Sequence, residues 1–84
     1  MFTVYILKTN KNTLYIGQTN NLERRLKQHR GTKQGAKYMK YFQSFELVYT
    51  EEFATRTESL KREYELKKLS RKEKDQLVVS KSAS

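Results

Sequence analysis

Apolar and polar residues alternate along two short stretches near the beginning of the chain. Between Phe2 and Lys8, Val4 and Ile6 fall on one face and Tyr5 on the other, and a second alternating stretch begins at Leu14. A period of two is typical of β-strands. The residues between the two stretches, TNKNT, have side chains that favour turns. This pattern therefore predicts a β-hairpin.

The spacing of the apolar residues becomes helical after Gly17. Leu22 and Leu26 are four residues apart, which places both on one face of a helix. Asn20 is a favourable N-cap residue, and Glu23 three positions later completes a capping box. We expect Gly17 to end the second strand, either through a strained backbone angle or because a neighbour approaches it closely.

A third strand is predicted from Phe45 to Phe53. In this stretch Phe45, Leu47 and Tyr49 alternate with Glu46 and Val48, so the three larger side chains are expected to share one face.

Two helices are predicted after the third strand. Thr55 and Glu58 form a capping box that begins a helix ending at about Leu69, and Ser70 begins a shorter one. The predicted fold is a three-stranded antiparallel sheet flanked by helices, of the α+β class. We expect a single domain over residues 1–79 and a flexible polar tail over residues 80–84.

Glu63 occupies an unusual position in the first of these two helices. It falls in the middle of an apolar stripe formed by Leu60, Tyr64 and Leu66. A carboxylate among apolar side chains is unfavourable unless it is paired or coordinates a cation. The alternative to a functional role is an ion pair with Lys67, one helical turn further on.

The charge of the chain indicates its partner. Its 18 Lys and Arg residues against 9 Asp and Glu give 84 residues a formal charge of +9. A polyanion, most simply nucleic acid, is the favoured partner, and solubility is the alternative. A membrane surface is less favoured, because no basic helix with a broad apolar face stands out.

Composition also restricts the chemistry. The absence of cysteine excludes disulfides, a thiolate nucleophile and cysteine-based zinc sites, and a single histidine excludes a multi-histidine metal centre. Any metal should therefore be a hard, Mg²⁺-like ion held by carboxylates. The apolar run Val4 to Leu7 is too short for a signal or membrane segment, so we expect a cytoplasmic protein. A monomer is the default expectation for its oligomeric state.

Basic and aromatic residues are interleaved between residues 30 and 42, RGTKQGAKYMKYF. Such a segment suits a surface that follows a phosphate backbone and stacks on bases. The alternative is a solvated connection whose aromatic side chains pack on the core. The cations that we expect to contact phosphates are Arg30, Lys33, Lys37 and Lys40.

Five residues form the candidate site. Tyr5 and Tyr15 should be cross-strand neighbours in the hairpin, and Arg25 and His29 lie one turn apart on the following helix. Glu63 is the carboxylate on a remote helix. No serine or cysteine is paired with the histidine, so the set does not form a hydrolase triad.

This set suits phosphodiester cleavage. Glu63 can hold Mg²⁺ together with phosphate oxygens, and Arg25 can bind a phosphate bidentately as negative charge develops. A tyrosine can accept a proton from water if nearby cations lower its pKa from about 10. The sequence does not indicate which tyrosine does so.

At these positions the chain resembles the GIY-YIG nuclease family, specifically its small stand-alone bacterial members. Thr3-Val4-Tyr5 stands where the family has Gly-Ile-Tyr, and Tyr15-Ile16-Gly17 is an intact YIG element. Arg25 and His29 follow Tyr15 at the family's spacing, and Glu63 matches its metal-binding glutamate. The resemblance extends from Phe2 to about Leu69, and it departs from the motif first at Thr3, which stands in place of glycine.

The resemblance implies a three-stranded antiparallel sheet and a divalent-metal-dependent DNA endonuclease, using Mg²⁺ or Mn²⁺. It implies catalytic roles for Tyr5, Tyr15, Arg25 and His29, and metal binding by Glu63. We expect selectivity for the structure of DNA rather than its sequence, with RNA as an open alternative substrate. Two rival interpretations are a non-catalytic nucleic-acid-binding module that retains the site, and an interaction domain whose charge serves only solubility.

Overall fold

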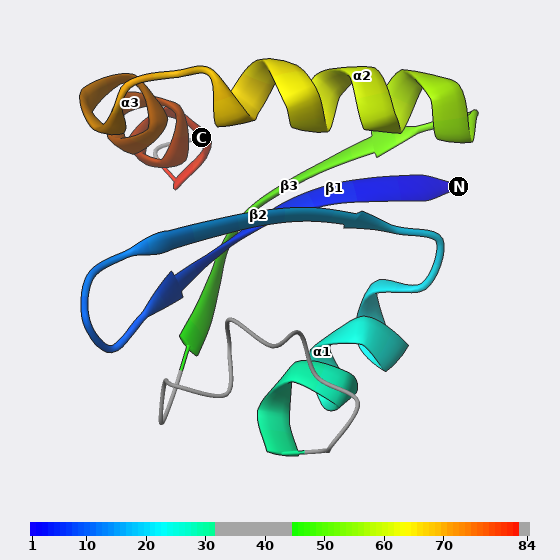
Figure 1. Cartoon of the computed structure of the whole chain (residues 1–84), viewed down its shortest axis with the longest axis horizontal. Helices are drawn as coiled ribbons and strands as arrows, with labels where there is room; N and C mark the ends of the chain where they lie inside the picture. The colour runs from blue at the N-terminus through cyan, green and yellow to red at the C-terminus, as the bar shows by residue number, and fades with distance from the viewer. Residues whose placement is uncertain (32–44, 83–84) are drawn as a thin grey trace.

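The elements follow the order predicted from the sequence. The structure is a computed structural model that describes residues 1–31 and 45–82, of which residues 28–31 and 82 are described by their backbone alone (Figure 1). The elements are β1 (Phe2–Thr9), β2 (Leu14–Thr19), α1 (Leu22–Gly31), β3 (Phe45–Phe53), α2 (Arg56–Lys67) and α3 (Arg71–Ser82).

The three strands form one antiparallel sheet in the order β2-β1-β3. The β1–β2 hairpin pairs Ile6 with Ile16 and Leu7 with Tyr15. In its turn, Asn12 adopts a positive φ of 65°, which asparagine tolerates better than most residues. The two short strands and their turn are therefore those that the alternating pattern predicts.

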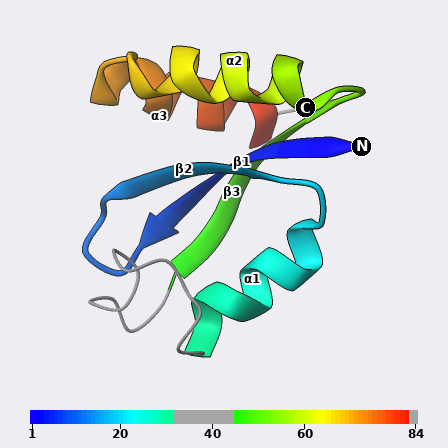
Figure 2. The ribbon, with the colours of Figure 1, turned by 45° about the vertical axis from the view of Figure 1, so that its right-hand side comes forward.

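Helices cover both faces of the sheet. Figures 1 and 2 show α2 and α3 on one face and α1 on the other. On the α2–α3 side, Val4 and Ile6 are completely buried in a cluster with Leu66 of α2. On the α1 side, Tyr5 and Leu7 form a second cluster, against which the leucines of α1 pack. The alternation of β1 thus supplies two cores, one from each face of the same strand.

A β-bulge alters the faces of β3. Ile6 pairs with Tyr49, but Leu7 pairs with Leu47, so Val48 is the extra residue on β3. Phe45 therefore packs in the α1-side cluster while Tyr49 belongs to the opposite one, and Leu47 is exposed. The prediction that the three share one face is wrong, because a bulge shifts the alternation by one residue.

The first helix begins one residue later than predicted. Asn21, not Asn20, is the cap: its Oδ1 accepts a hydrogen bond from the backbone N–H of Arg24 at 3.1 Å. The backbone N–H of Asn21 in turn donates to the hydroxyl of Thr19 at 3.1 Å. Because β2 continues to Thr19, the chain needs the additional residue before helical geometry begins. At α2 the predicted cap is confirmed, since the hydroxyl of Thr55 accepts from the N–H of Glu58.

The apolar stripe predicted for α2 is wrong. Leu60 and Tyr64 are exposed, whereas Ser59 and Leu66 are completely buried. Residues seven apart return to the same helix face, and the small side chain of Ser59 lets the helix approach the sheet. Glu63 lies between Ser59 and Leu66 along that face. It is therefore on the inward side of α2, as expected, but its neighbours there are Ser59 and Leu66 and not Leu60 and Tyr64.

The last helix extends further than predicted. It continues to Ser82, three residues into the segment expected to form the tail. The Nζ of Lys81 donates a hydrogen bond to the carbonyl of Thr50 and lies 5.2 Å from the ring centroid of Tyr49. These contacts hold the final turn against β3. The division into one domain and a short tail stays a prediction.

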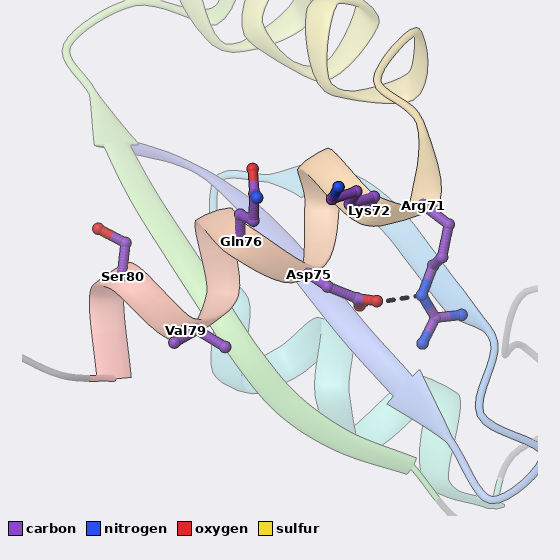
Figure 3. A pocket seen from close by; sticks show the side chains of 6 residues that line it. All are labelled: Arg71, Lys72, Asp75, Gln76, Val79 and Ser80. Carbon is purple, nitrogen blue, oxygen red and sulfur yellow. Dashed lines mark hydrogen bonds and ion pairs between the residues drawn. The ribbon is translucent and has the colours of Figure 1, made fainter.

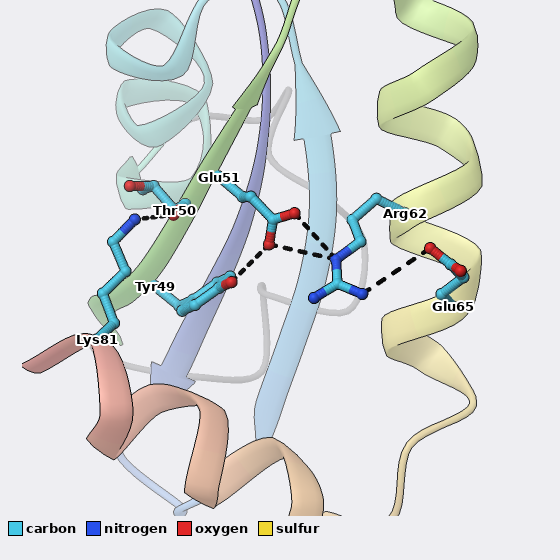
Figure 4. Close-up of polar contacts among 6 residues, drawn as sticks. All are labelled: Tyr49, Thr50, Glu51, Arg62, Glu65 and Lys81. Carbon is cyan, nitrogen blue, oxygen red and sulfur yellow. Dashed lines mark hydrogen bonds and ion pairs between the residues drawn. The ribbon is translucent and has the colours of Figure 1, made fainter.

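A polar network joins β3 to α2 (Figure 4). The hydroxyl of Tyr49 donates to Oε2 of Glu51 at 2.5 Å, and Nε of Arg62 donates to the two oxygens of the same carboxylate at 3.0 and 3.2 Å. Glu65 lies 3.9 Å from Arg62 on the solvent side. The network fixes the distance between the strand and the helix that carries Glu63. In the part of the chain that the structure describes, no helix is long and apolar enough to cross a membrane.

Candidate active site at the edge of the sheet

The two tyrosines of the candidate site are diagonal neighbours on adjacent strands. Tyr5 pairs with Gly17 and Tyr15 pairs with Leu7, so the tyrosines are offset by one pair of residues. Their ring centroids are 6.4 Å apart and their planes are tilted by 35°. The predicted cross-strand proximity is confirmed, and it places both rings on the α1 side of the sheet.

Gly17 makes room for the ring of Tyr5. A Cβ atom at Gly17 would lie 2.5 Å from the hydroxyl oxygen of Tyr5 and 2.7 Å from its Cζ, closer than real contacts allow. No glycine in the described ranges has a positive φ, so the requirement is space rather than backbone conformation. Gly17 does not end the strand, which continues to Thr19. The phenol of Tyr5 therefore rests directly on the backbone of β2.

Burial determines the ionisation of Tyr5. Its side chain is only 1% exposed, and this desolvation raises its pKa well above the usual value. Tyr15 and Glu63 raise the pKa of Tyr5 further, while Arg25 lowers it. Nearby cations therefore do not lower the pKa of Tyr5 below its usual value, as proton acceptance by this tyrosine would require. The same influences show that Arg25 and Glu63, on opposite sides of the sheet, both act on this hydroxyl.

Glu63 and Tyr15 line one cavity at the β2 edge of the sheet. The cavity has a volume of ≈ 360 Å³ and is also bounded by Lys67 and Lys74. The side chain of Glu63 is 19% exposed, and its Oε2 lies 3.2 Å from Nζ of Lys67, whose side chain is 56% exposed. The alternative ion pair is therefore formed, but it is open to solvent on the lysine side.

A hard divalent cation fits the donors of this cavity. Glu63 offers a carboxylate, the ligand that Mg²⁺ prefers, and Mg²⁺ commonly takes only one or two protein carboxylates. Among the residues that the structure describes, no group of three or more His, Cys, Asp and Glu side chains is placed to hold a metal. An ion at Glu63 would complete its coordination with water and substrate phosphate oxygens.

Arg25 lines a separate hollow at the start of α1. This hollow has a volume of ≈ 260 Å³, and Thr19, Asn20, Asn21 and Arg24 also line it. The Asn21 cap positions Arg25 in the first turn of the helix, where it is half-buried. Within residues 1–31 and 45–82 neither Arg24 nor Arg25 has a carboxylate partner in an ion pair. Two guanidinium groups are thus available to an anionic ligand at this end of the site.

Several predicted residues are not tested by this geometry. His29 lies in α1, four residues after Arg25, but its side chain is outside what the structure describes, as is that of Arg30. Lys33, Lys37 and Lys40 lie outside the described residues altogether. Their assignments stay predictions.

The structure adds Lys74 and Arg24 to the candidate site. Arg24 adjoins Arg25 in sequence, so a closer inspection of the RR pair could have found it. Lys74 carries no such signal, because only the packing of α3 brings it to the cavity of Glu63. Another hollow, of ≈ 660 Å³, lies along α3 and contains the ion pair of Arg71 and Asp75, but none of the candidate residues lines it (Figure 3).

The chain is similar to a known protein family and to a protein of solved structure. The model of the GIY-YIG catalytic domain matches residues 1–76. UPF0213 protein CPE1444 of Clostridium perfringens is 49% identical over 94% of this chain and 84% of its own length. UPF0213 protein YazA of Bacillus subtilis is 41% identical over 95% and 80%.

A solved structure agrees in fold. The solution NMR structure of UPF0213 protein BH0048 from Bacillus halodurans is 41% identical, covers 96% of this chain and 86% of that one, and superimposes with a TM-score of 0.63. The match to the family model spans the strands that carry both tyrosines and the helices that carry Arg25 and Glu63. The chain therefore belongs to the GIY-YIG family, and its relatives are small UPF0213 proteins.

Proposed function

We propose that this chain is a metal-dependent endonuclease that hydrolyses phosphodiester bonds of DNA, with selectivity for structure or weak sequence specificity. The observation that carries the proposal is the meeting of Glu63 and Tyr15 in one cavity at the β2 edge. Tyr5 lies beside Tyr15, with ring centroids 6.4 Å apart, and Arg25 lines a second hollow at the start of α1. Membership of a family with a catalytic domain supports nuclease chemistry.

Glu63 and Arg25 have different tasks in this proposal. Glu63 would hold Mg²⁺ or Mn²⁺, and such an ion supplies Lewis acidity toward a phosphate oxygen and binds the water to be activated. Arg25 contacts the scissile phosphate through two N–H groups and stabilises the charge that develops on it. Its first-turn position in α1 holds the guanidinium at the entrance to the site.

The two tyrosines have different tasks. Tyr5 is buried and its pKa is raised, so it remains protonated and acts as a hydrogen-bond donor. Tyr15 is half-buried and lines the cavity of Glu63, where a water molecule that enters the cavity can reach its hydroxyl. We assign proton acceptance to Tyr15 on this ground. His29 is retained as a catalytic residue on the strength of its position in the sequence.

The charge of the chain supports nucleic acid as the substrate. A formal charge of +9 favours binding to a phosphate backbone, and Arg30, Lys33, Lys37 and Lys40 are the proposed contacts outside the cavity. Duplex, branched, nicked and single-stranded DNA are all candidates, as is RNA.

The test is cleavage of a panel of branched, nicked, duplex and single-stranded DNAs and RNAs, with Mg²⁺, with Mn²⁺ and with chelator. We expect cleavage only with a metal ion, and its loss in Glu63→Gln. Glu65→Gln is the matched control, because Glu65 is an exposed carboxylate of the same helix. Equal cleavage by the Glu63→Gln and Glu65→Gln variants would refute the assignment of the metal ligand.

A non-catalytic nucleic-acid-binding module is the second candidate. It is favoured by the ion pair of Glu63 with Lys67, which satisfies the carboxylate without a metal. This function predicts salt-dependent DNA binding in chelator and no cleavage of any substrate by the wild-type protein. Metal-dependent cleavage that Glu63→Gln abolishes would exclude it.

A further inference from the structure

In the cavity of Glu63, the side chain of Lys67 already supplies a positive charge next to the carboxylate. Nζ of Lys67 lies 3.2 Å from Oε2 of Glu63, and the two residues are one turn apart on α2. The carboxylate is largely shielded, at 19% exposed, while the lysine is 56% exposed. The carboxylate therefore stays in place, and the long lysine side chain is the partner that can leave.

The other charges of the cavity favour an anionic ligand. Lys74 lines the same cavity from α3, and within the described residues it has no carboxylate partner. Two ammonium groups against one carboxylate leave the cavity with an excess of positive charge. A phosphate group that enters it meets Lys74 at once, and meets Lys67 only if that lysine is released from Glu63.

We propose that Lys67 is an exchangeable counter-ion of Glu63: Lys67 would leave the carboxylate when Glu63 holds a divalent cation, and its freed ammonium group would then contact substrate phosphate. The inference rests on the proposed function and adds to it a residue that couples the two ligands. Lys67 lowers the affinity for the metal in the absence of nucleic acid, because two cations compete for one carboxylate. Once phosphate is present, the lysine has a second partner and the competition weakens.

The metal side of the exchange is tested by titrating Mn²⁺, with the free ion followed by electron paramagnetic resonance. Lys67→Met should bind Mn²⁺ about 1.5- to 5-fold more tightly than wild type, a range set by the modest strength of a partly exposed pair. Lys61→Met is the control, because Lys61 is exposed on the same helix and does not line the cavity. It removes the same charge and should change the affinity less. Equal affinities in the two variants would overturn the inference.

The phosphate side is tested without any metal. Replacing Glu63 by glutamine removes the carboxylate charge and frees Lys67, as an ion would. In chelator, Glu63→Gln should bind a DNA duplex more tightly than wild type, with a log–log salt slope steeper by roughly 0.9. Adding Lys67→Met to that variant should remove the gain, whereas Lys67→Met alone should have little effect. Glu65→Gln removes an equal charge and should leave the slope unchanged. A double-mutant cycle without coupling contradicts the exchange.

The metal site at Glu63 and the role of Lys67 can be refuted separately. Mn²⁺ binding that Glu63→Gln leaves intact would overturn the proposed metal site, and the exchange with it. Mn²⁺ binding that Glu63→Gln abolishes, but that Lys67→Met and Lys61→Met change alike, would overturn only the role of Lys67. Thermal melts of all variants establish that each is folded, as the exposure of both lysines leads us to expect.

Discussion

Gly17 and Tyr5 pack directly against each other in the candidate site. The ring of Tyr5 occupies the space that a side chain at Gly17 would fill, so the glycine of the YIG element and the tyrosine of the first motif depend on one another. A motif that reads as two separate elements in the sequence is one packing unit in the structure. The unit keeps the phenol of Tyr5 buried between β2 and α1.

Gly17→Ala should therefore destabilise the protein by about 1–3 kcal/mol, the usual effect of adding a methyl group to a filled site. Urea unfolding measures the change. In a Tyr5→Leu background, where the ring is absent, the same substitution should have a smaller effect. An equal loss in both backgrounds would show that the penalty comes from the backbone and not from Tyr5.

The raised pKa of Tyr5 predicts a dependence of stability on pH. The unfolded protein ionises this tyrosine at about pH 10, whereas the folded protein does so only at higher pH. Stability should thus be unaffected by Tyr5 below pH 10 and fall above it, by up to about 1.4 kcal/mol per pH unit. Urea unfolding at pH 9 and pH 11 checks this. Tyr5→Phe should show a smaller fall, and an identical fall in both proteins would contradict the assignment.

Arg25 provides a test of chemistry at a single residue. Arg25→Lys keeps the charge and the aliphatic stem but loses the planar guanidinium group, so the protein should fold normally and bind DNA with little change. Cleavage should fall by about 10²–10³-fold, the usual loss for a donor that stabilises the transition state. Single-turnover cleavage and an equilibrium binding assay separate the two effects. Arg56→Lys, at an exposed position that lines neither the cavity of Glu63 nor the hollow of Arg25, should retain the activity.

At the scale of elements, α2 presents an unusual face to the sheet. Its completely buried residues are Ser59 and Leu66, and Glu63 lies between them. The hydroxyl of Ser59 lies 3.2 Å from the side-chain oxygen of Gln18, so part of the contact between α2 and β2 is polar. The position of α2 depends also on the network of Glu51 and Arg62. A helix attached in this way can carry a carboxylate on its inner face.

The stability of this arrangement can be tested with Glu63→Leu. Because Lys67 is largely exposed, the ion pair contributes at most about 1 kcal/mol, and leucine adds apolar burial. The variant should be as stable as wild type or more stable by up to about 1 kcal/mol, and inactive. Glu51→Leu, which leaves Arg62 and Tyr49 without their acceptor, should by contrast lose about 1–3 kcal/mol. A loss of about 3 kcal/mol or more in Glu63→Leu would identify a buried structural pair instead.

At the scale of the whole molecule, the candidate site passes around one edge of the sheet. Helix α1 supplies Arg25 from one face, and helix α2 supplies Glu63 from the other (Figure 2). Strand β2 lies at that edge and separates them. The proposed function places the substrate at this edge, between the layer of α1 and the layer of α2 and α3.

The charge of the whole chain predicts a steep salt dependence of DNA binding. If Lys33, Lys37 and Lys40 contact phosphates, their triple alanine variant should reduce the log–log slope by roughly 0.9 per contact on duplex and 0.7 on single strands. A control with alanine at Lys8, Lys11 and Lys61, three exposed residues elsewhere, removes the same charge. Equal slopes in the two triple variants would show that residues 33–40 hold no special position at the interface.

The sequence by itself determined the local elements of this protein. Alternation and capping residues predicted the hairpin, the span of β3 and the start of α2, because these depend on residues close together in the chain. The motif spacing also predicted that Tyr5, Tyr15, Arg25 and Glu63 form one site, and that assignment stays a prediction. The sequence did not determine the first residue of α1. Asn20 and Asn21 are equally suited to cap the helix, and the end of β2 at Thr19 selects Asn21.

Tertiary structure alone decided how these elements face one another. The bulge at Val48 depends on the pairing of β3 with β1, and it moved Phe45 and Tyr49 to opposite faces. The inward face of α2 was decided by how closely the small side chain of Ser59 lets the helix approach, which an apolar pattern does not record. Lys74 reached the cavity of Glu63 through the packing of α3. Each of these depends on contacts between residues far apart in the chain, and no local pattern encodes such contacts.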